Sequence, residues 1–149
     1  MNRVTASTEI SAPPEAVWSL VCDGNRLPEW LTPISQVRSV EDEGVLSDGS
    51  TVKVKMVGNV PPGQRVSVKE VVPGEKIRLV VGPAFAHALG IAMRVDLKLE
   101  PTENGTLATV DFTCHPVMGG LQRRISGMNM TKHVRSTTQH LKEAAESAT

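Results

Sequence analysis

The chain has 149 residues, with 16 basic and 16 acidic side chains, so its formal net charge is zero. This balance argues against the basic surface of proteins that bind nucleic acid or an anionic membrane, and we expect no nucleic-acid partner. The length suits one domain over residues 1–149. No apolar run is long enough to cross a bilayer and no signal-peptide core follows the N-terminus, so we expect no integral membrane segment and a cytoplasmic location.

The first 23 residues predict a strand followed by a capped helix. Residues 4–10 alternate between two kinds of side chain with the period of two of a half-buried strand. Pro13 and Pro14 end this strand, and a proline in the first turn of a helix loses no hydrogen bond. Glu15 places a negative charge where the helix dipole favours it. The buried face of this helix is expected to hold Val17, Trp18, Leu20 and Val21.

A second short turn follows, and with it a family resemblance. Gly24-Asn25 ends the first helix, and Pro28 opens a turn that presents Trp30 and Leu31. The run E-I-x-A-P-P-E-x-V-W-x-L-V-x-D over residues 9–23, followed by P-x-W at 28–30, resembles the opening of the polyketide cyclase/dehydrase-like branch of the SRPBCC superfamily, which includes START and birch-pollen-allergen-like proteins. This resemblance implies a helix-grip fold, in which a seven-stranded antiparallel sheet curves around a long C-terminal helix.

Strand patterns dominate the middle of the chain. Residues 51–57 alternate with Met56 on the apolar face, and residues 91–100 alternate with Met93 inward. Arg94 and Asp96 then point outward, as does Asp111 of the last strand. Asn104-Gly105 predicts a tight hairpin that joins these last two strands. The remaining predicted strands cover residues 64–72, 76–81 and 106–114, the last with Phe112 and Cys114 inward.

From Gly120 onward the period changes to that of a helix. One long amphipathic helix is predicted, with an apolar stripe of Leu121, Ile125, Met128, Val134, Thr138, Leu141 and Ala145. Antiparallel strands that are polar on one face require this helix to cover the other face. The pattern therefore predicts an α+β helix-grip with a short helix and a second short turn after the first strand. The resemblance adds the seventh strand and implies that this second turn is also a short helix.

The motifs of metal and thiol chemistry are missing from the sequence. Cys22 and Cys114 have no C-x-x-C partner, so we expect two reduced thiols. His133 and His140 are seven residues apart, about 10.5 Å along a helix, which is too far for one metal ion. We expect no metal and no cofactor.

The inward side chains are nearly all apolar, and the chain has no tyrosine and only two phenylalanines. Valine and methionine in place of aromatic rings either pack against one another or leave an open cavity. The resemblance implies a cavity, and such pockets typically hold ~300–1,000 Å³. The residues expected around a bound ligand are Trp30, Met56, Met93, Phe112, Ile125 and Met128.

Polar groups that could orient a ligand are few. His87 lies in a connection rich in Gly, Pro and Ala, where it either lines the cavity mouth or is solvated, and His115 after the last strand has the same two interpretations. Arg124 lies on the predicted helix, and Asn129 and His133 lie near its apolar stripe, where either could reach the cavity. For His133 we favour solvation on the helix surface.

The resemblance implies several functions. Relatives bind lipids or polyketides, cyclise and dehydrate polyketides, or contact a protein partner. The fold alone does not distinguish among these functions. We favour binding of a small hydrophobic molecule. The first alternative is an aromatase/cyclase or dehydratase that uses His87, His115 or Arg124. A cyclase needs inward donors and acid–base groups, typically an arginine with tyrosine or other polar residues. This chain has no tyrosine, and its clearest strand arginine, Arg94, is expected to point outward. The second alternative is a protein-interaction module with an unidentified partner.

Overall fold

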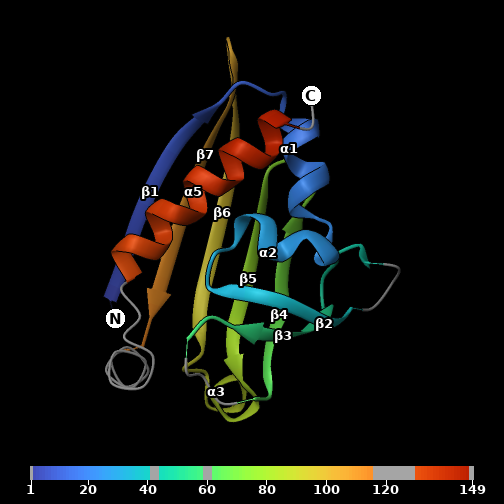
Figure 1. The fold of residues 1–149 in the computed structure, drawn as a ribbon, viewed down its shortest axis with the longest axis vertical. Helices are drawn as coiled ribbons and strands as arrows, with labels where there is room; N and C mark the ends of the chain where they lie inside the picture. The colour runs from blue at the N-terminus through green and yellow to red at the C-terminus, as the bar shows by residue number, and fades with distance from the viewer. Residues whose placement is uncertain (1, 41–43, 59–61, 116–129, 148–149) are drawn as a thin grey trace.

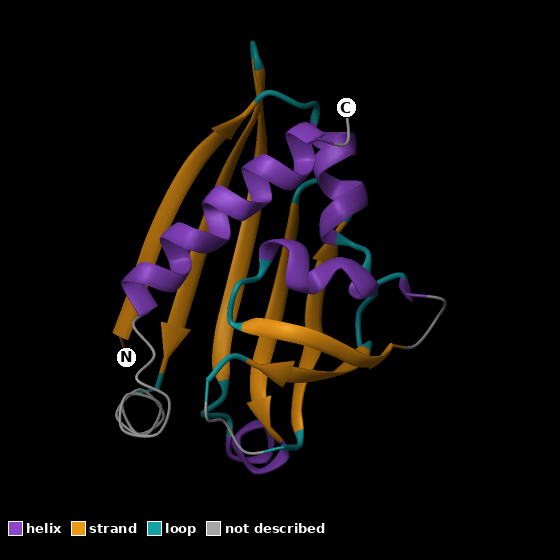
Figure 2. Ribbon diagram, in the orientation of Figure 1, coloured by secondary structure: helices purple, strands orange, loops and turns teal. Residues whose placement is uncertain are grey.

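In the described part of the chain, seven antiparallel strands form one sheet and a long C-terminal helix lies across it in the computed structural model (Figures 1 and 2). The structure describes residues 2–40, 44–58, 62–115 and 130–147. The strand order is β1-β7-β6-β5-β4-β3-β2. The elements are β1 (Asn2–Ile10), α1 (Pro14–Val21), η1 (Gly24–Arg26), α2 (Leu27–Trp30), β2 (Ile34–Val40), β3 (Thr51–Met56), β4 (Gln64–Val72), β5 (Lys76–Pro83), α3 (Ala84–Leu89), β6 (Met93–Thr102), β7 (Gly105–Cys114) and α5 (Met130–Ser147).

The sheet curls around the helices, as the predicted helix-grip requires. Figure 1 shows α5 running diagonally in front of β1, β7 and β6, while β2 and β3 cross in front of β4 and β5. The contacts of α5 with β1, β7, α1 and α2 agree with this view. We call the face of the sheet toward α5 and α2 the inner face and the opposite face the outer face.

The N-terminal predictions are largely confirmed. Pro14 occupies the first turn of α1 beside Glu15. At the other end of the helix, the backbone N–H of Cys22 donates to the carbonyl of Trp18 at 2.9 Å, and that of Asp23 donates to the carbonyl of Leu20 at 3.4 Å. Asp23 accepts a hydrogen bond from the backbone N–H of Asn25 at 3.0 Å and so opens η1. Trp18 is only half-buried, which differs from its predicted burial, because the inward face of α1 consists of Val17, Leu20 and Val21.

Alternation along the strands is confirmed, and no disulfide joins Cys22 and Cys114 in the described structure. The hairpin between β6 and β7 differs by one residue from the prediction, since Thr102 pairs with Gly105 and the turn therefore holds Glu103 and Asn104. Gly105 has a φ of 150° and lies so close to the carbonyl oxygen of Ile10 that any side chain would collide with it. The glycine is thus required by close packing against the end of β1.

Three elements differ from the sequence patterns or extend beyond them. Strand β2 is the seventh strand, and only Ile34 in it is fully buried. Residues 84–89 form the short helix α3, where the pattern indicated an irregular connection, and Gly90 ends it with a φ of 69°. The described C-terminal helix begins at Met130, and the predicted residues Leu121, Ile125 and Met128 lie outside the described residues. The rest of the predicted stripe is buried, namely Val134, Thr138, Leu141 and Ala145.

The outer face is a ladder of ion pairs, as the alternation predicted. Asp96 accepts a hydrogen bond from Nε of Arg78 at 2.6 Å and lies 3.1 Å from Nε of Arg94. Asp111 pairs with Arg3 at 3.1 Å. All of these side chains are partly exposed, so each pair contributes little to stability.

Candidate functional site

The inner face is where the sequence predicts a ligand, and four of the six predicted contact residues are described there. Trp30, Met56, Met93 and Phe112 are all buried, with exposed fractions of at most 6%. Phe112 of β7 pairs with Val95 of β6 in the sheet register. Val95 follows Met93 by two residues, so all three side chains lie on the same face. The other two predicted residues, Ile125 and Met128, lie outside the described residues.

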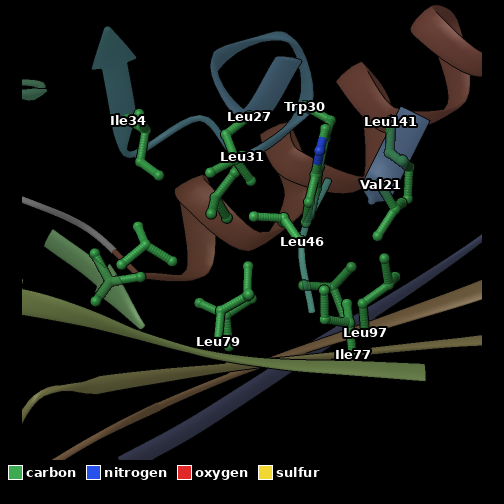
Figure 3. Packing of buried hydrophobic residues seen from close by; sticks show 14 of the residues in the cluster. Val21, Leu27, Trp30, Leu31, Ile34, Leu46, Ile77, Leu79, Leu97 and Leu141 are labelled. Carbon is green, nitrogen blue, oxygen red and sulfur yellow. The ribbon is translucent and has the colours of Figure 1, made fainter. Parts of the chain in front are cut away.

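Trp30 at the end of α2 contributes the most unusual polar group of this interior. Its side chain is fully buried, and Figure 3 shows its indole extending from α2 toward the sheet, beside Leu46 and between Leu31 and Leu141. Among the described residues, its Nε1–H has no hydrogen-bond partner. An indole nitrogen can only donate, and a buried donor without an acceptor costs about 1–3 kcal/mol. The apolar interior therefore contains a donor that an incoming oxygen atom could satisfy.

A polar cluster joins α5 to the connection between α2 and β2. The hydroxyl of Thr32 lies 3.2 Å from the carbonyl oxygen of His133 and 3.1 Å from the hydroxyl of Thr137. Nδ1 of His133 lies 3.5 Å from the same Thr32 hydroxyl, and the backbone N–H of Thr32 donates to Thr137 at 3.3 Å. Burial, followed by the charge of Lys132, lowers the pKa of His133. His133 is thus half-buried, with its ring close to the Thr32 segment and partly solvated.

Two buried polar residues were missed by the sequence analysis. Thr137 is fully buried one turn before Leu141, a spacing that the helical stripe itself could have indicated. Gln64 is 6% exposed and precedes Val66 by two residues on β4, so the alternation that placed Val66 inward applies to it as well. Gln64 is thus an amide on the inner face.

His87 and His115 belong to the other side of the sheet. The ring of His87 lies on α3, with Nδ1 3.3 Å from the hydroxyl of Ser67 and Nε2 within 3.2 Å of the carbonyl oxygens of Arg65 and Gly82. Ser67 alternates with the inward Val66 and Val68, so its side chain projects from the outer face. His115 lines a pocket with His87 and Thr113 on that face.

Two further predicted polar groups, Arg124 and Asn129, lie outside the described residues. Every fully buried residue in the described ranges is uncharged, so the described inner face offers apolar contacts and a few neutral donors and acceptors. Within those ranges no three His, Cys, Asp or Glu side chains come close enough to hold a metal ion. The described helices also include none that is long and apolar enough to span a membrane.

The chain matches a family model described as "Polyketide cyclase / dehydrase and lipid transport" over residues 1–146. No curated protein matches it. Protein CV1439 from Chromobacterium violaceum has a similar structure, with a TM-score of 0.70 and 21% identity over 98% of this chain and 99% of that one. DynU16, described as a protein in the dynemicin biosynthetic locus, has a TM-score of 0.66 and 17% identity, and the match covers 98% of this chain and 48% of DynU16.

Norcoclaurine synthase from Thalictrum, solved with a transition-state analogue, has a TM-score of 0.64 and 12% identity over 97% of this chain and 93% of that one. At these identities the structural similarities establish the fold, and each neighbour's ligand or reaction is a property of that neighbour.

Proposed function

We propose that this chain binds a small hydrophobic molecule between the inner face and the C-terminal helix. It belongs to the polyketide cyclase/dehydrase and lipid transport family. The ligand contacts are Trp30, Met56, Met93, Phe112, Ile125 and Met128. We assign no catalytic role to any of these residues.

The observation that carries the proposal is the indole N–H of Trp30, which lies in an apolar interior and has no partner in the described part of the chain. In a tightly packed core the unsatisfied donor would offset part of the stabilisation that burial of the ring contributes, whereas a ligand with a carbonyl or hydroxyl oxygen would satisfy it. Methionines at positions 56 and 93 suit ligands of irregular shape, because an unbranched thioether adapts its conformation. The expected ligand is thus apolar with at least one oxygen acceptor, as lipids and polyketides are.

Two variants of β6 test the proposal. Met93 points to the inner face and Lys98 to the outer face of the same strand. We expect Met93→Trp to weaken binding of the neutral fluorescent probe N-phenyl-1-naphthylamine at least about tenfold, or ~1.4 kcal/mol, by filling the ligand space. Lys98→Trp adds the same ring outside and should leave the affinity unchanged. Circular dichroism melts of both variants accompany the titrations.

Equal probe affinity in a folded Met93→Trp variant would overturn the assignment of the site. Should Met93→Trp fail to fold, Met93→Ala gives the answer, because it removes atoms instead of adding them. Its probe affinity should change while that of Lys98→Ala does not.

The observations do not favour the two alternatives. A cyclase or dehydratase would need acid–base groups beside the ligand, yet His87 and His115 line a pocket on the outer face. A protein-interaction module would expose an extended apolar surface. Of the described residues of α3, Phe85 and Leu89 are exposed by 53% and 69%, and two side chains make a small patch.

A further inference from the structure

A pocket of about 330 Å³ lies on the outer face of the sheet, between α3 and strands β4 to β7. Its side chains come from elements far apart in the sequence: Lys69 from β4, His87 from α3, Arg94 from β6, Thr113 from β7 and His115 just after it. Since Met93 and Phe112 point inward, their neighbours Arg94 and Thr113 must point outward. The pocket is therefore separated from the proposed ligand site by the thickness of the sheet.

The titratable side chains that line this pocket are all basic. In the described part of the chain they are Lys69, His87, Arg94 and His115, and no Asp or Glu is among the lining residues there. Asp96, the partner of Arg94, is shared by two guanidinium groups, at 2.6 Å from Arg78 and 3.1 Å from Arg94. One carboxylate cannot balance two guanidinium groups, so the wall of the pocket keeps a positive charge.

Thr113 supplies the second, independent observation. It is 7% exposed, and among the described residues its hydroxyl has no hydrogen-bond partner. It lies directly opposite Arg94 in the pairing of β6 with β7. A hydroxyl can donate to an anionic oxygen, and a hydrogen bond to a charged acceptor is stronger than a neutral one. The unpartnered donor and the positive charge thus point to the same kind of ligand.

The pocket is held in shape by the way α3 packs on the sheet. A side chain at Gly82 would meet Ala92 at 3.2 Å and Ala86 at 3.5 Å, so the glycine lets the start of α3 approach the strands. His87 then anchors the helix through Ser67 and through backbone carbonyls. Burial lowers the pKa of His87, which suits a neutral anchoring ring. The positive groups left for a ligand are therefore those on the strands.

We propose that this outer-face pocket binds the phosphate group of a small phosphate monoester, with Lys69, Arg94 and Thr113 as its donors and His115 at its edge. A phosphate presents three strong acceptor oxygens and up to two negative charges, which matches donors arriving from three strands. The volume exceeds that of a bare anion, so it leaves room for part of the organic group. A carboxylate, with two oxygens and one charge, would accept fewer hydrogen bonds from these donors and would be attracted less strongly by their positive charge.

Isothermal titration at constant ionic strength tests this assignment with phenyl phosphate, inorganic phosphate and benzoate as probes. Phenyl phosphate should bind at least as tightly as inorganic phosphate, and benzoate at least about tenfold more weakly. Arg94→Gln should weaken phenyl phosphate binding at least about tenfold, and Thr113→Val about two- to tenfold. Lys98→Gln removes an exposed positive charge from the outer face of the same strand and should have no effect. Arg94→Lys should recover part of the affinity, because it restores charge without the planar donors.

The proposal is overturned if phenyl phosphate produces no binding heat in the wild type. It is also overturned if benzoate binds as tightly, if inorganic phosphate binds more tightly than the ester, or if Lys98→Gln weakens binding as much as Arg94→Gln. Binding of N-phenyl-1-naphthylamine should be unchanged in Arg94→Gln and Thr113→Val, which also establishes that both variants are folded. Failure of the inner-face proposal would leave the phosphate titrations unaffected.

Discussion

Replacing Trp30 with phenylalanine tests whether the buried indole N–H is unpartnered. The change removes two ring carbons, at about 0.8 kcal/mol for each buried carbon group, and an N–H whose unpartnered burial costs about 1–3 kcal/mol. These contributions oppose each other because the side chain is fully buried and Nε1 has no partner among the described residues. We therefore expect the free energy of unfolding of the variant to lie within about 1.5 kcal/mol of the wild type.

Urea denaturation followed by circular dichroism measures this difference, with Trp18→Phe as the matched control. Trp18 is half-buried, and its nitrogen is not among the buried atoms without partners, so the control loses carbons without removing an unsatisfied donor. It should therefore only lower stability. A loss of about 3 kcal/mol or more in Trp30→Phe, the range of a tryptophan truncated to alanine, would refute the reasoning.

The same variant tests the role of the indole toward a ligand. Wild-type protein should bind 2-acetylnaphthalene about two- to twelvefold more tightly than 2-ethylnaphthalene, since a hydrogen bond to the carbonyl contributes about 0.5–1.5 kcal/mol. Trp30→Phe should bind the two compounds equally. A preference that survives the substitution would show that another group satisfies the carbonyl.

Two further predictions concern stability. Thr113→Val should raise the free energy of unfolding by about 1 kcal/mol in phosphate-free buffer, because it removes a buried hydroxyl that has no partner within the described ranges. A lower melting temperature would contradict this. His87 and His133 have lowered pKa values through burial, aided by the charges of Arg65 and Lys69 at His87 and of Lys132 at His133. These two histidines therefore bind protons more readily in the unfolded chain than in the folded one. Their contribution to the free energy of unfolding is fully present above about pH 6.5 and is lost as the pH falls through their lower pKa values in the folded protein. Urea unfolding at pH 7.5 and 5.5 should show this loss, and the double variant of both histidines to glutamine should show a smaller one.

Much of the fold could be predicted because its signals are local. A period of two fixes which face of each strand is buried, and the proline pair at 13–14 fixes the entry to α1. Strand β2 escaped this reasoning because only Ile34 in it is fully buried and its pairing with β3 is interrupted by register shifts. Helix α3 has six residues, too few to establish a helical period.

The candidate sites were less predictable because they depend on what surrounds each side chain. Alternation places Arg94 and Thr113 outward, yet only the packing of α3 turns that surface into a pocket. The placement of His87 depends on the same packing, and the sequence left it open. Whether a hydroxyl or an indole N–H finds a partner is a property of the folded neighbourhood, so the unpartnered atoms of Thr113 and Trp30 have no sequence signal.

Adjacent residues of β6 serve the two proposed sites, Met93 on the inner face and Arg94 on the outer face. The strand between them is paired on both sides, with β5 and with β7, so backbone displacement at this position would break ladder hydrogen bonds on two neighbours. A ligand in one site can change the affinity of the other site only if that strand has two arrangements and the ligand binds one of them more tightly. Because a strand held on both sides resists such rearrangement, the fold favours two sites that bind independently, one for an apolar molecule and one for a phosphate group.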